Sequence, residues 1–325
     1  MTTIKDVAKK AGVSTTTVSR VMNNKGNFSK ETIDRVYEVM DSLGYQPNEV
    51  ARTLGKKKSK MIALILPGSE IPAFGQLTSA IEKYIYQRGY KLLLSNSLFD
   101  IEKEEECIKM LKNNMIEGII VGSFSNEMSH FENAEMPIVS IGRKFNENIP
   151  AVHSDNKSAG ILAVRHLFAK GCKKIIYLTG YMGDLKYDGK YMGFIDICKK
   201  LEIENYVYKV TVDMQLECDF FKVINQILMD HPNVDGIFAE TDLLAMDCIK
   251  TFSSFGYRIP QDIKIIGFGD LYFSKLMNPP LTTIIDDTEK LAFNIVDQIV
   301  NQIEKKDNKK RDICIPVSLI ERKTT

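Results

Sequence analysis

Residues 3–22 read TIKDVAKKAGVSTTTVSRVM, and their apolar spacing predicts two short helices joined by a tight turn. The first helix can begin after Thr3, a residue type that is preferred as an N-cap. Gly12 breaks this helix, and Ser14 can cap a second helix that runs to Met22. The apolar positions of the first helix follow the spacing of one helical face, at Ile4, Val7, Ala8 and Ala11.

A third helix is predicted over residues 29–43, with Gly44 as its stop. Two short helices joined by a glycine-containing turn, supported by a third helix, form a helix-turn-helix. The first fold element is therefore a small all-α head.

The outward face of the second helix carries the chemistry of this head. Val18 and Val21 point inward, and the polar residues on the opposite side are Thr16, Ser19, Arg20 and Asn23. Hydroxyl groups reach phosphates or base edges, and Arg20 is the one long side chain able to engage guanine O6 and N7 together. The alternative is that these residues only form a solvated helix face. Any one of them fits that alternative, but the whole pattern argues against it.

Charge is distributed unevenly along the chain, although the formal net charge is only +1. Residues 1–60 contain 12 Lys and Arg against 6 Asp and Glu, a net charge of +6. The other 265 residues contain 31 against 36, a net charge of −5. A basic head on an acidic body predicts a polyanionic partner for one end only.

The segment that follows the head, residues 47–55, has the pattern of a short helix that is not stable by itself. Pro47 fits a first helical turn and Gly55 ends the helix, but so few residues do not hold a helix alone. We therefore expect a linker that becomes helical only when something packs against it. The lysines at 56–58 and 60 fit a solvated tether or a DNA contact.

After residue 60, short apolar strands alternate with amphipathic helices. This pattern predicts parallel sheets covered on both faces, and so many units favour two doubly wound lobes with a ligand between them. The expected strands are 61–66, 90–95, 118–121, 138–141, 174–178, 207–210, 236–239 and 263–267. The expected helices are 75–88, 102–113, 157–170, 189–201, 218–229, 242–255 and 289–303.

The whole chain resembles the lactose/galactose-repressor (LacI/GalR) family of transcriptional regulators. The resemblance is carried by TIKDVA at 3–8, AGVS at 11–14, TVSRV at 17–21, GYQPN at 44–48 and PPLTTI at 279–284. It implies that Thr15, Thr16 and Arg20 read bases, and that Ser14, Thr17, Ser19 and Asn23 hold phosphates. Asn48 joins this DNA-binding set, and Leu54 matches the hinge-helix leucine that wedges into the minor groove.

The resemblance also implies an organisation. Residues 1–46 would form the DNA-binding head, 47–60 the hinge, and 61–325 a periplasmic-binding-protein-like sensor. Its first lobe would take roughly 61–157 plus 286–312, and its second 158–285 plus 313–325. Because one head offers few contacts, we expect a homodimer that reads a near-palindromic double-stranded operator.

The resemblance carries ligand-binding roles to Phe74, Arg143, Asp155, Lys190, Thr241, Asp270 and Asp286. Lys190 replaces a family arginine, so a bidentate grip becomes a point charge. Gly269 replaces a common sugar-binding aspartate, which leaves Asp270 as the second carboxylate. The two cations suit a sugar or a sugar phosphate. For Asp286 and Thr241, a core or surface role is the competing interpretation.

Other functional classes find little support in the sequence. The four histidines, at 130, 153, 166 and 231, show no metal-ligand spacing, and no serine or cysteine lies in a nucleophile motif. The six cysteines form no regular framework, and the N-terminus lacks an apolar signal segment. We therefore expect a cytoplasmic protein with no cofactor, metal, catalytic residue or membrane contact.

Three functions remain to be weighed. The first is a repressor of a carbohydrate-utilisation operon, whose DNA affinity a bound sugar or sugar phosphate controls allosterically; its closest resemblance is to sucrose-operon repressors. The second is a global carbon-catabolite regulator of the same fold that docks a phosphocarrier protein. The third, a sugar-transport binding protein or a sugar-modifying enzyme, is disfavoured by the fused head and the missing signal peptide.

Overall fold

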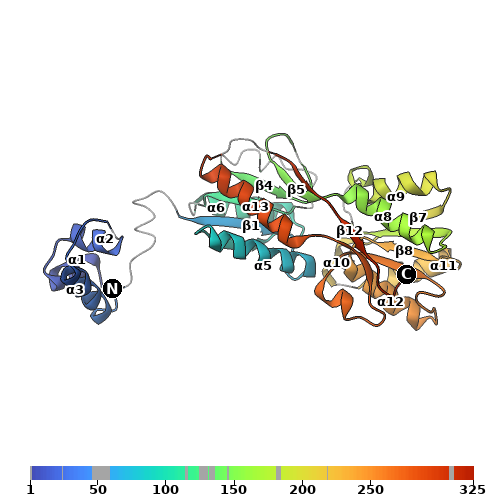
Figure 1. Cartoon of the computed structure of the whole chain (residues 1–325), viewed down its shortest axis with the longest axis horizontal. Helices are drawn as coiled ribbons and strands as arrows, with labels where there is room; N and C mark the ends of the chain where they lie inside the picture. Colours follow the sequence, from blue (N-terminus) through green and yellow to red (C-terminus); the bar gives the residue numbers. More distant parts are fainter. Residues whose placement is uncertain are drawn as a thin grey trace. The chain divides into compact units, whose positions relative to one another are not determined.

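The computed structural model describes residues 2–23, 25–45, 59–113, 116–123, 131, 136–144, 146–180, 184–217, 219–306 and 311–325. The chain divides into two compact units, Met1–Ser59 and Lys60–Thr325 (Figure 1). In the described part of the chain, no helix is long and apolar enough to cross a membrane. Nor does any group of three His, Cys, Asp or Glu side chains among those residues have a geometry that could hold a metal ion.

The described part of the first unit contains three helices, α1 (Ile4–Ala11), α2 (Thr15–Met22) and α3 (Lys30–Ser42). Thr3 and Asp6 interlock at the start of α1, where the Thr3 backbone N–H donates to Asp6 Oδ2 at 2.8 Å. Gly12 ends α1 in the left-handed conformation, at φ 68°. The buried residues at the centre of the unit are Val7, Ala8, Ala11, Val18, Val21, Val36 and Met40.

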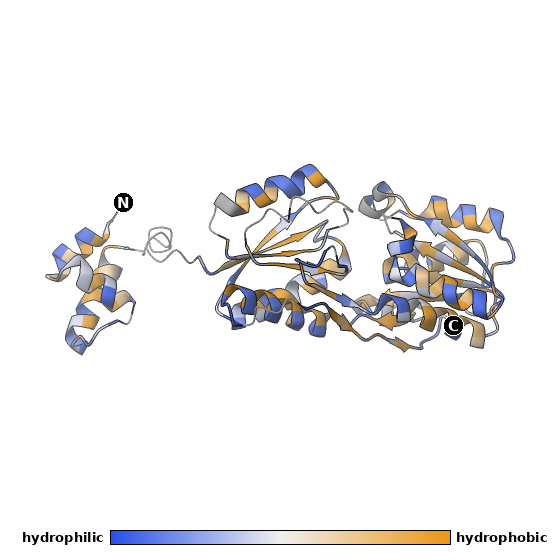
Figure 2. Cartoon of the chain, turned by 90° about the horizontal axis from the view of Figure 1, so that it is seen from above, coloured by the Kyte–Doolittle hydropathy of each residue, from blue (hydrophilic) through white to orange (hydrophobic). Residues whose placement is uncertain are grey.

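The second unit contains two six-stranded sheets, one in each lobe. Lobe one has the strand order β11-β5-β4-β3-β1-β2 and lobe two the order β12-β10-β9-β8-β6-β7. In Figure 2 the strands of both lobes are largely orange, whereas the helices carry blue outer faces, as expected for sheets buried between helices.

Among the described residues, the elements of lobe one are β1 (Met61–Leu66), α5 (Pro72–Gln87), β2 (Lys91–Asn96), α6 (Ile101–Asn113), β3 (Gly118–Val121), β4 (Ile138–Ile141), β5 (Ala151–Ser154), α13 (Thr288–Ile303) and β11 (Ile313–Ile315). The elements of lobe two are α8 (Asn156–Ala169), β6 (Lys174–Thr179), α9 (Gly189–Lys200), β7 (Glu204–Lys209), α10 (Val212–Glu217), α11 (Phe221–Asp230), β8 (Gly236–Ala239), α12 (Asp242–Ser254), β9 (Lys264–Gly269), β10 (Thr282–Ile285) and β12 (Ser318–Ile320). Lobe two also contains the 3-10 turns Leu185–Tyr187 and Tyr272–Lys275.

Alternating side chains of the first strand in each lobe pack against opposite layers. On β1, Ile62, Leu64 and Leu66 join the cluster of α5 and α13, whereas Ala63 and Ile65 join the cluster of α6. On β6, alternate residues likewise face either α11 and α12 or α8 and α9. This two-sided burial explains why these strands read as continuous apolar runs.

The chain crosses between the lobes three times, after β5, after β10 and after β11. The third crossing lies later than the predicted lobe boundary at residue 312, because β11 pairs with β5 of lobe one. Only β12 enters lobe two, where it runs antiparallel to β10. Strands β5, β10, β11 and β12 and helix α10 were not predicted, and β7 begins three residues earlier than predicted, at Glu204 rather than Val207. The four missed strands have only three or four residues, and pairing at the crossings stabilises them more than local pattern does.

Helices α8 and α9 pack with their backbones in direct contact. A Cβ atom added to Gly193 would lie 2.0 Å from the Lys157 carbonyl oxygen, and one added to Gly160 would lie 2.1 Å from the Lys190 carbonyl oxygen. Glycine is therefore required at both positions. This contact fixes the first turn of α9, which carries Lys190.

Candidate functional site

The exposed face of α2 is the first candidate site. Ser14, Thr15, Thr16, Ser19 and Arg20 are exposed, whereas Val18 and Val21 are buried. Thr17 and Asn23 are half-buried at the two ends of this face. The arrangement presents hydroxyl groups and one guanidinium group on a helix whose opposite side is anchored in the core.

Hydrogen bonds within α2 hold the ends of this face in place. Ser14 caps the helix by accepting the Thr17 backbone N–H at 3.0 Å, and the two hydroxyl oxygens lie 2.9 Å apart. At the other end, the Asn23 amide donates to the Ser19 carbonyl oxygen at 2.6 Å. Asn48 and Leu54 lie outside the described residues.

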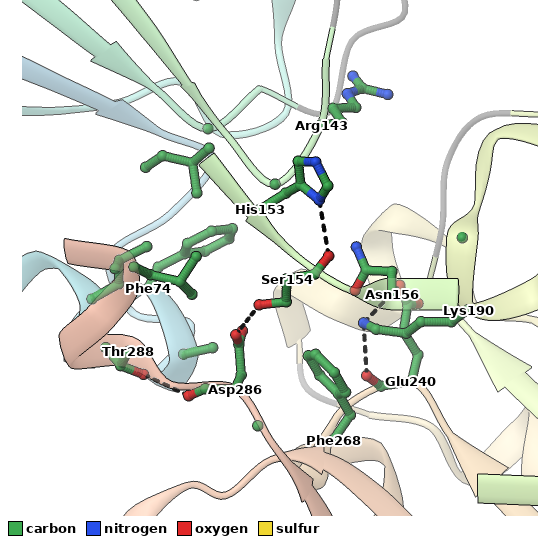
Figure 3. A pocket seen from close by; sticks show the side chains of 18 of the residues that line it. Phe74, Arg143, His153, Ser154, Asn156, Lys190, Glu240, Phe268, Asp286 and Thr288 are labelled. Atoms are coloured by element: carbon green, nitrogen blue, oxygen red, sulfur yellow. Dashed lines mark hydrogen bonds and ion pairs between the residues drawn. The ribbon is translucent and has the colours of Figure 1, made fainter. Parts of the chain in front are cut away.

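A cavity of about 240 Å³ lies between the two lobes of the second unit (Figure 3). Residues from the crossings after β5 and β10 and from the carboxyl ends of strands line it, as expected for doubly wound sheets. Four of the predicted ligand-binding residues line this cavity: Phe74, Arg143, Lys190 and Asp286.

Lobe one contributes an apolar patch beside polar side chains such as Gln76 and His153. Phe74 comes from the first turn of α5, and Leu77, Ile141 and Leu291 extend the same surface. Arg143 follows β4 and is half-buried, and Figure 3 places its side chain beyond His153, away from Lys190. The apolar patch can cover the carbon face of a small ligand.

Lobe two contributes charged groups that are already hydrogen-bonded. Lys190 Nζ donates to the Glu240 carbonyl oxygen at 3.3 Å and lies 3.8 Å from Glu240 Oε1. It also lies 3.8 Å from the centre of the Phe268 ring, within cation–π range. The second carboxylate oxygen of Glu240 accepts the Thr179 hydroxyl at 2.8 Å and the Gly180 backbone N–H.

Asp188 supports this wall from beneath. It caps α9 by accepting the Lys190 backbone N–H at 2.9 Å, and its other oxygen accepts the Tyr177 hydroxyl at 2.9 Å. Burial, together with the charge of Glu240, raises the pKa of Asp188, and burial raises the pKa of Tyr177 well above its usual value. Asp188 and Glu240 thus place two acidic groups in one partly buried cluster.

A hydrogen bond joins two of the lobe crossings at the edge of the cavity. The Ser154 hydroxyl, at the end of β5, donates to Asp286 Oδ1, just after β10. Burial raises the pKa of Asp286, against the opposing effects of Ser154 and Lys190. A ligand contacting these residues therefore touches the segments about which the lobes would rotate.

The other three predicted ligand-binding residues do not line the cavity. Asp155 caps α8, accepting the Ser158 backbone N–H at 3.0 Å, and Thr241 caps α12, accepting the Leu244 backbone N–H at 3.2 Å. Asp270 pairs with the Arg322 guanidinium at 2.5 Å. Their polar atoms satisfy helix ends and the C-terminal segment instead.

Sequence reasoning missed several cavity residues, above all Glu240, Asp188, His153 and Phe268. Glu240 directly follows β8, at a carboxyl strand end, and this position was a usable signal. His153 lies in β5, a strand that was not predicted, so the hydrophobic periodicity gave no indication that this residue lines the cavity.

Comparison with known proteins adds two family matches. Residues 59–323 match the model of periplasmic binding proteins and the sugar-binding domain of the LacI family. Residues 3–48 match the model of bacterial regulatory proteins of the lacI family.

Curated relatives extend along the full chain. The ribose operon repressor of Halalkalibacterium halodurans is 37% identical over 100% of this chain and 97% of its own length. The sucrose operon repressor of Streptococcus mutans is 33% identical over 97% of each.

Solved structures agree with these relatives. A LacI-type regulator from Alkaliphilus metalliredigens, complexed with D-xylulofuranose, is 32% identical with a TM-score of 0.75, covering 82% of this chain and 99% of its own. The lac repressor dimer bound to operator is 25% identical with a TM-score of 0.88, covering 100% of this chain and 99% of its own. With an exposed helix-turn-helix face, a bilobed sensor and family matches over both, the chain belongs to the LacI family of bacterial regulatory proteins.

Proposed function

We propose that this chain is a sequence-specific DNA-binding repressor of a carbohydrate-utilisation operon. It acts in the cytoplasm as a homodimer, without catalysis, and a sugar or sugar phosphate in the interlobe cavity sets its DNA affinity. The carrying observation is the exposed Thr15, Thr16 and Arg20 face of α2 in a chain that also holds a ligand-sized cavity between two lobes.

The relatives support this proposal by analogy. Two of them are repressors of sugar operons, one similar structure holds a sugar, and another is a dimer on its operator. We propose the domain roles accordingly, with residues 1–46 as the DNA-binding head, 47–60 as the hinge and the remainder as the sensor. Within the head, Ser14, Thr17, Ser19 and Asn23 hold phosphates while the three residues named above read bases.

The cavity supports a mechanism for ligand control. Phe74 and Arg143 belong to lobe one, Lys190 to lobe two and Asp286 to a crossing, so a ligand that contacts all four favours one lobe arrangement. Ligand control needs only a differential affinity between two arrangements. A coupling of about 1–3 kcal/mol changes operator affinity by roughly 5–150-fold.

Substitution of Arg20 tests the DNA-reading role. The operator is first selected from random duplexes with the full chain, and affinities are then measured by fluorescence anisotropy at fixed salt. Arg20→Ala should lower operator affinity by roughly 10–100-fold and relax the preference for one base, because a bidentate guanine contact discriminates by about 1–3 kcal/mol.

The matched control is Arg35→Ala, which removes the same charge from an exposed position on α3. It should leave the ratio of operator to random-duplex affinity unchanged. Equal losses on operator and random duplex for Arg20→Ala would contradict the base-reading assignment.

A further inference from the structure

We propose that Glu240 makes the cavity selective for an uncharged monosaccharide, because it holds Lys190 in an ion pair and withdraws that cation from a phosphate group. This inference rests on the proposed function and names the ligand class of the same site. It decides between the sugar and the sugar phosphate that the sequence leaves open.

The Lys190 ammonium group lies at the cavity wall and is held there by its neighbours. Its side chain is only 11% exposed and that of Glu240 only 16%. Lys190 Nζ lies 3.3 Å from the Glu240 carbonyl oxygen, 3.8 Å from Glu240 Oε1 and 3.8 Å from the centre of the Phe268 ring. One N–H of the ammonium group donates to the Glu240 carbonyl oxygen, and the Glu240 carboxylate and the Phe268 ring attract the same positive charge electrostatically.

Glu240 is itself held in place by lobe two. Its Oε2 accepts the Thr179 hydroxyl and the Gly180 backbone N–H, while Oε1 faces Lys190. Hydrogen bonds to a charged acceptor are among the stronger ones in proteins. Turning Glu240 away to release Lys190 would break both of them, so the pair resists rearrangement when an anion arrives.

The overall charge of the cavity wall argues in the same direction. The lining residues include three carboxyl groups, Asp188, Glu240 and Asp286, against two cations, Arg143 and Lys190. A phosphate monoester would add about 1.5 to 2 negative charges at neutral pH. Like charges in a partly buried site repel one another strongly. Sugar hydroxyls, in contrast, donate to carboxylates.

The size of the cavity favours a single ring. Its volume of about 240 Å³ falls below the roughly 300–1,000 Å³ that is usual for sites holding drug-sized ligands. Phe74 and Phe268 supply aromatic faces within this space. The cavity therefore fits one monosaccharide better than a disaccharide.

Inorganic phosphate is the first probe, because it tests Lys190 without knowledge of the sugar. Binding to the full-length chain is measured by calorimetry for the wild type, Glu240→Gln and the double variant Glu240→Gln/Lys190→Gln. Glu240→Gln should raise phosphate affinity by roughly tenfold or more, since it frees a cation to form charge-assisted hydrogen bonds. The double variant should return to the wild-type value.

A matched control separates this effect from a general change in charge. Asp196 pairs with Lys157 at 2.7 Å on an exposed face of α8 and α9. Asp196→Asn removes the same charge as Glu240→Gln and likewise leaves a lysine, Lys157, without its carboxylate partner, but it should not raise phosphate affinity. The inference is overturned if wild-type protein binds phosphate through Lys190, or if folded Glu240→Gln gains no affinity.

Paired sugars provide the second measurement. D-ribose, D-fructose and D-glucose are each compared with their 5- or 6-phosphates, and sucrose is added as a disaccharide. The wild type should bind at least one free monosaccharide roughly tenfold or more tightly than its phosphate, and Glu240→Gln should narrow that ratio. A preference for any phosphate or for sucrose, or no monosaccharide binding, overturns the inference. Loss of operator binding would instead defeat the proposed function and leave these results unchanged.

Discussion

The two lobes of the sensor share one topology but present different chemistry to the cavity between them. Numbered within each lobe, both sheets have the order sixth, fifth, fourth, third, first, second. They differ at the last strand, which is parallel in lobe one and antiparallel in lobe two. The reason is that β11 runs toward the crossing, as β5 does, whereas β12 runs away from it.

The two lobes differ more in the side chains that line the cavity than in their strand order. Lobe one faces the cavity with an apolar patch that includes Phe74 and Leu291, whereas lobe two presents Lys190, Glu240 and Asp188 in one hydrogen-bonded cluster. The shared fold therefore determines where a ligand can lie, and the side chains determine which ligand is accepted.

The largest expected effect comes from the buried carboxylate that organises lobe two. Asp242 is fully buried and accepts hydrogen bonds from the Leu271 N–H at 2.7 Å and from the Ser274 and Thr283 hydroxyls at 2.6 and 2.5 Å. Asp242→Ala would leave these donors without their acceptor, and should lower the free energy of unfolding by about 2–4 kcal/mol. Urea unfolding followed by circular dichroism measures this loss.

The control for Asp242 lies in lobe one. Asp297 pairs with Arg88 at 2.6 Å between α13 and the end of α5, with both side chains more than a third exposed. Asp297→Ala should cost no more than about 1 kcal/mol, because solvent screens exposed pairs. Similar losses for the two variants would show that the lobes do not differ in how they use carboxylates.

The next effect tests the backbone contact between α8 and α9. In Gly193→Ala the new methyl group would meet the Lys157 carbonyl oxygen at 2.0 Å, and neither backbone can yield cheaply. We expect a loss of stability of about 1–3 kcal/mol and weaker sugar binding, since α9 carries Lys190. Thermal unfolding and calorimetry measure the two effects.

Gly75, on helix α5 of lobe one, is the matched control for Gly193. A Cβ atom there would have the Ser69 carbonyl oxygen at 3.3 Å as its nearest neighbour. Gly75→Ala should be close to neutral, because the helix propensity that alanine gains, up to about 1 kcal/mol, offsets the cost of this tight contact. Unfolding at the same midpoint for both variants would contradict the contact seen at Gly193.

The sequence predicted elements best where one pattern spans a whole element. Strands β1, β3, β4 and β8 have the predicted bounds, because apolar runs between turns define both of their ends. The short strands at the lobe crossings depend on partners far away in the chain. β11, with three residues, pairs with β5 across more than 150 positions, and local periodicity carries no record of that pairing.

The predicted site divides along similar lines. Arg143, Lys190 and Phe74 line the cavity, and Asp286, for which a core role competed, lines it as well. Asp155 does not line the cavity, although the sequence favoured a ligand-binding role for Asp155 more than for Asp286. A usable warning was present, because Asp and Thr are preferred N-caps: Thr241 stands directly before a predicted helix, and Asp155 stands two residues before another.

The smallest expected effect asks whether surface charge pairs of lobe two matter as much as its buried carboxylates. Arg258 binds Asp262 with two side-chain N–H groups, Nε at 2.9 Å and Nη2 at 2.7 Å, and with its backbone N–H at 2.7 Å. The Arg258 guanidinium lowers the pKa of Asp262 to about 2. Because this value lies below that of an unfolded aspartate, at about 3.9, the pair stabilises the protein above pH 4.

That contribution should disappear as the pH falls toward 2, where Asp262 is protonated in the folded state too. Asp262→Asn should therefore lower the urea midpoint slightly at pH 7, and its difference from the wild type should shrink between pH 4 and pH 2. In an Arg258→Gln background the same substitution should have a smaller effect at pH 7, because the ionised partner is gone. A difference that grows on acidification would contradict the assignment, since only a carboxyl with a raised pKa gives that sign.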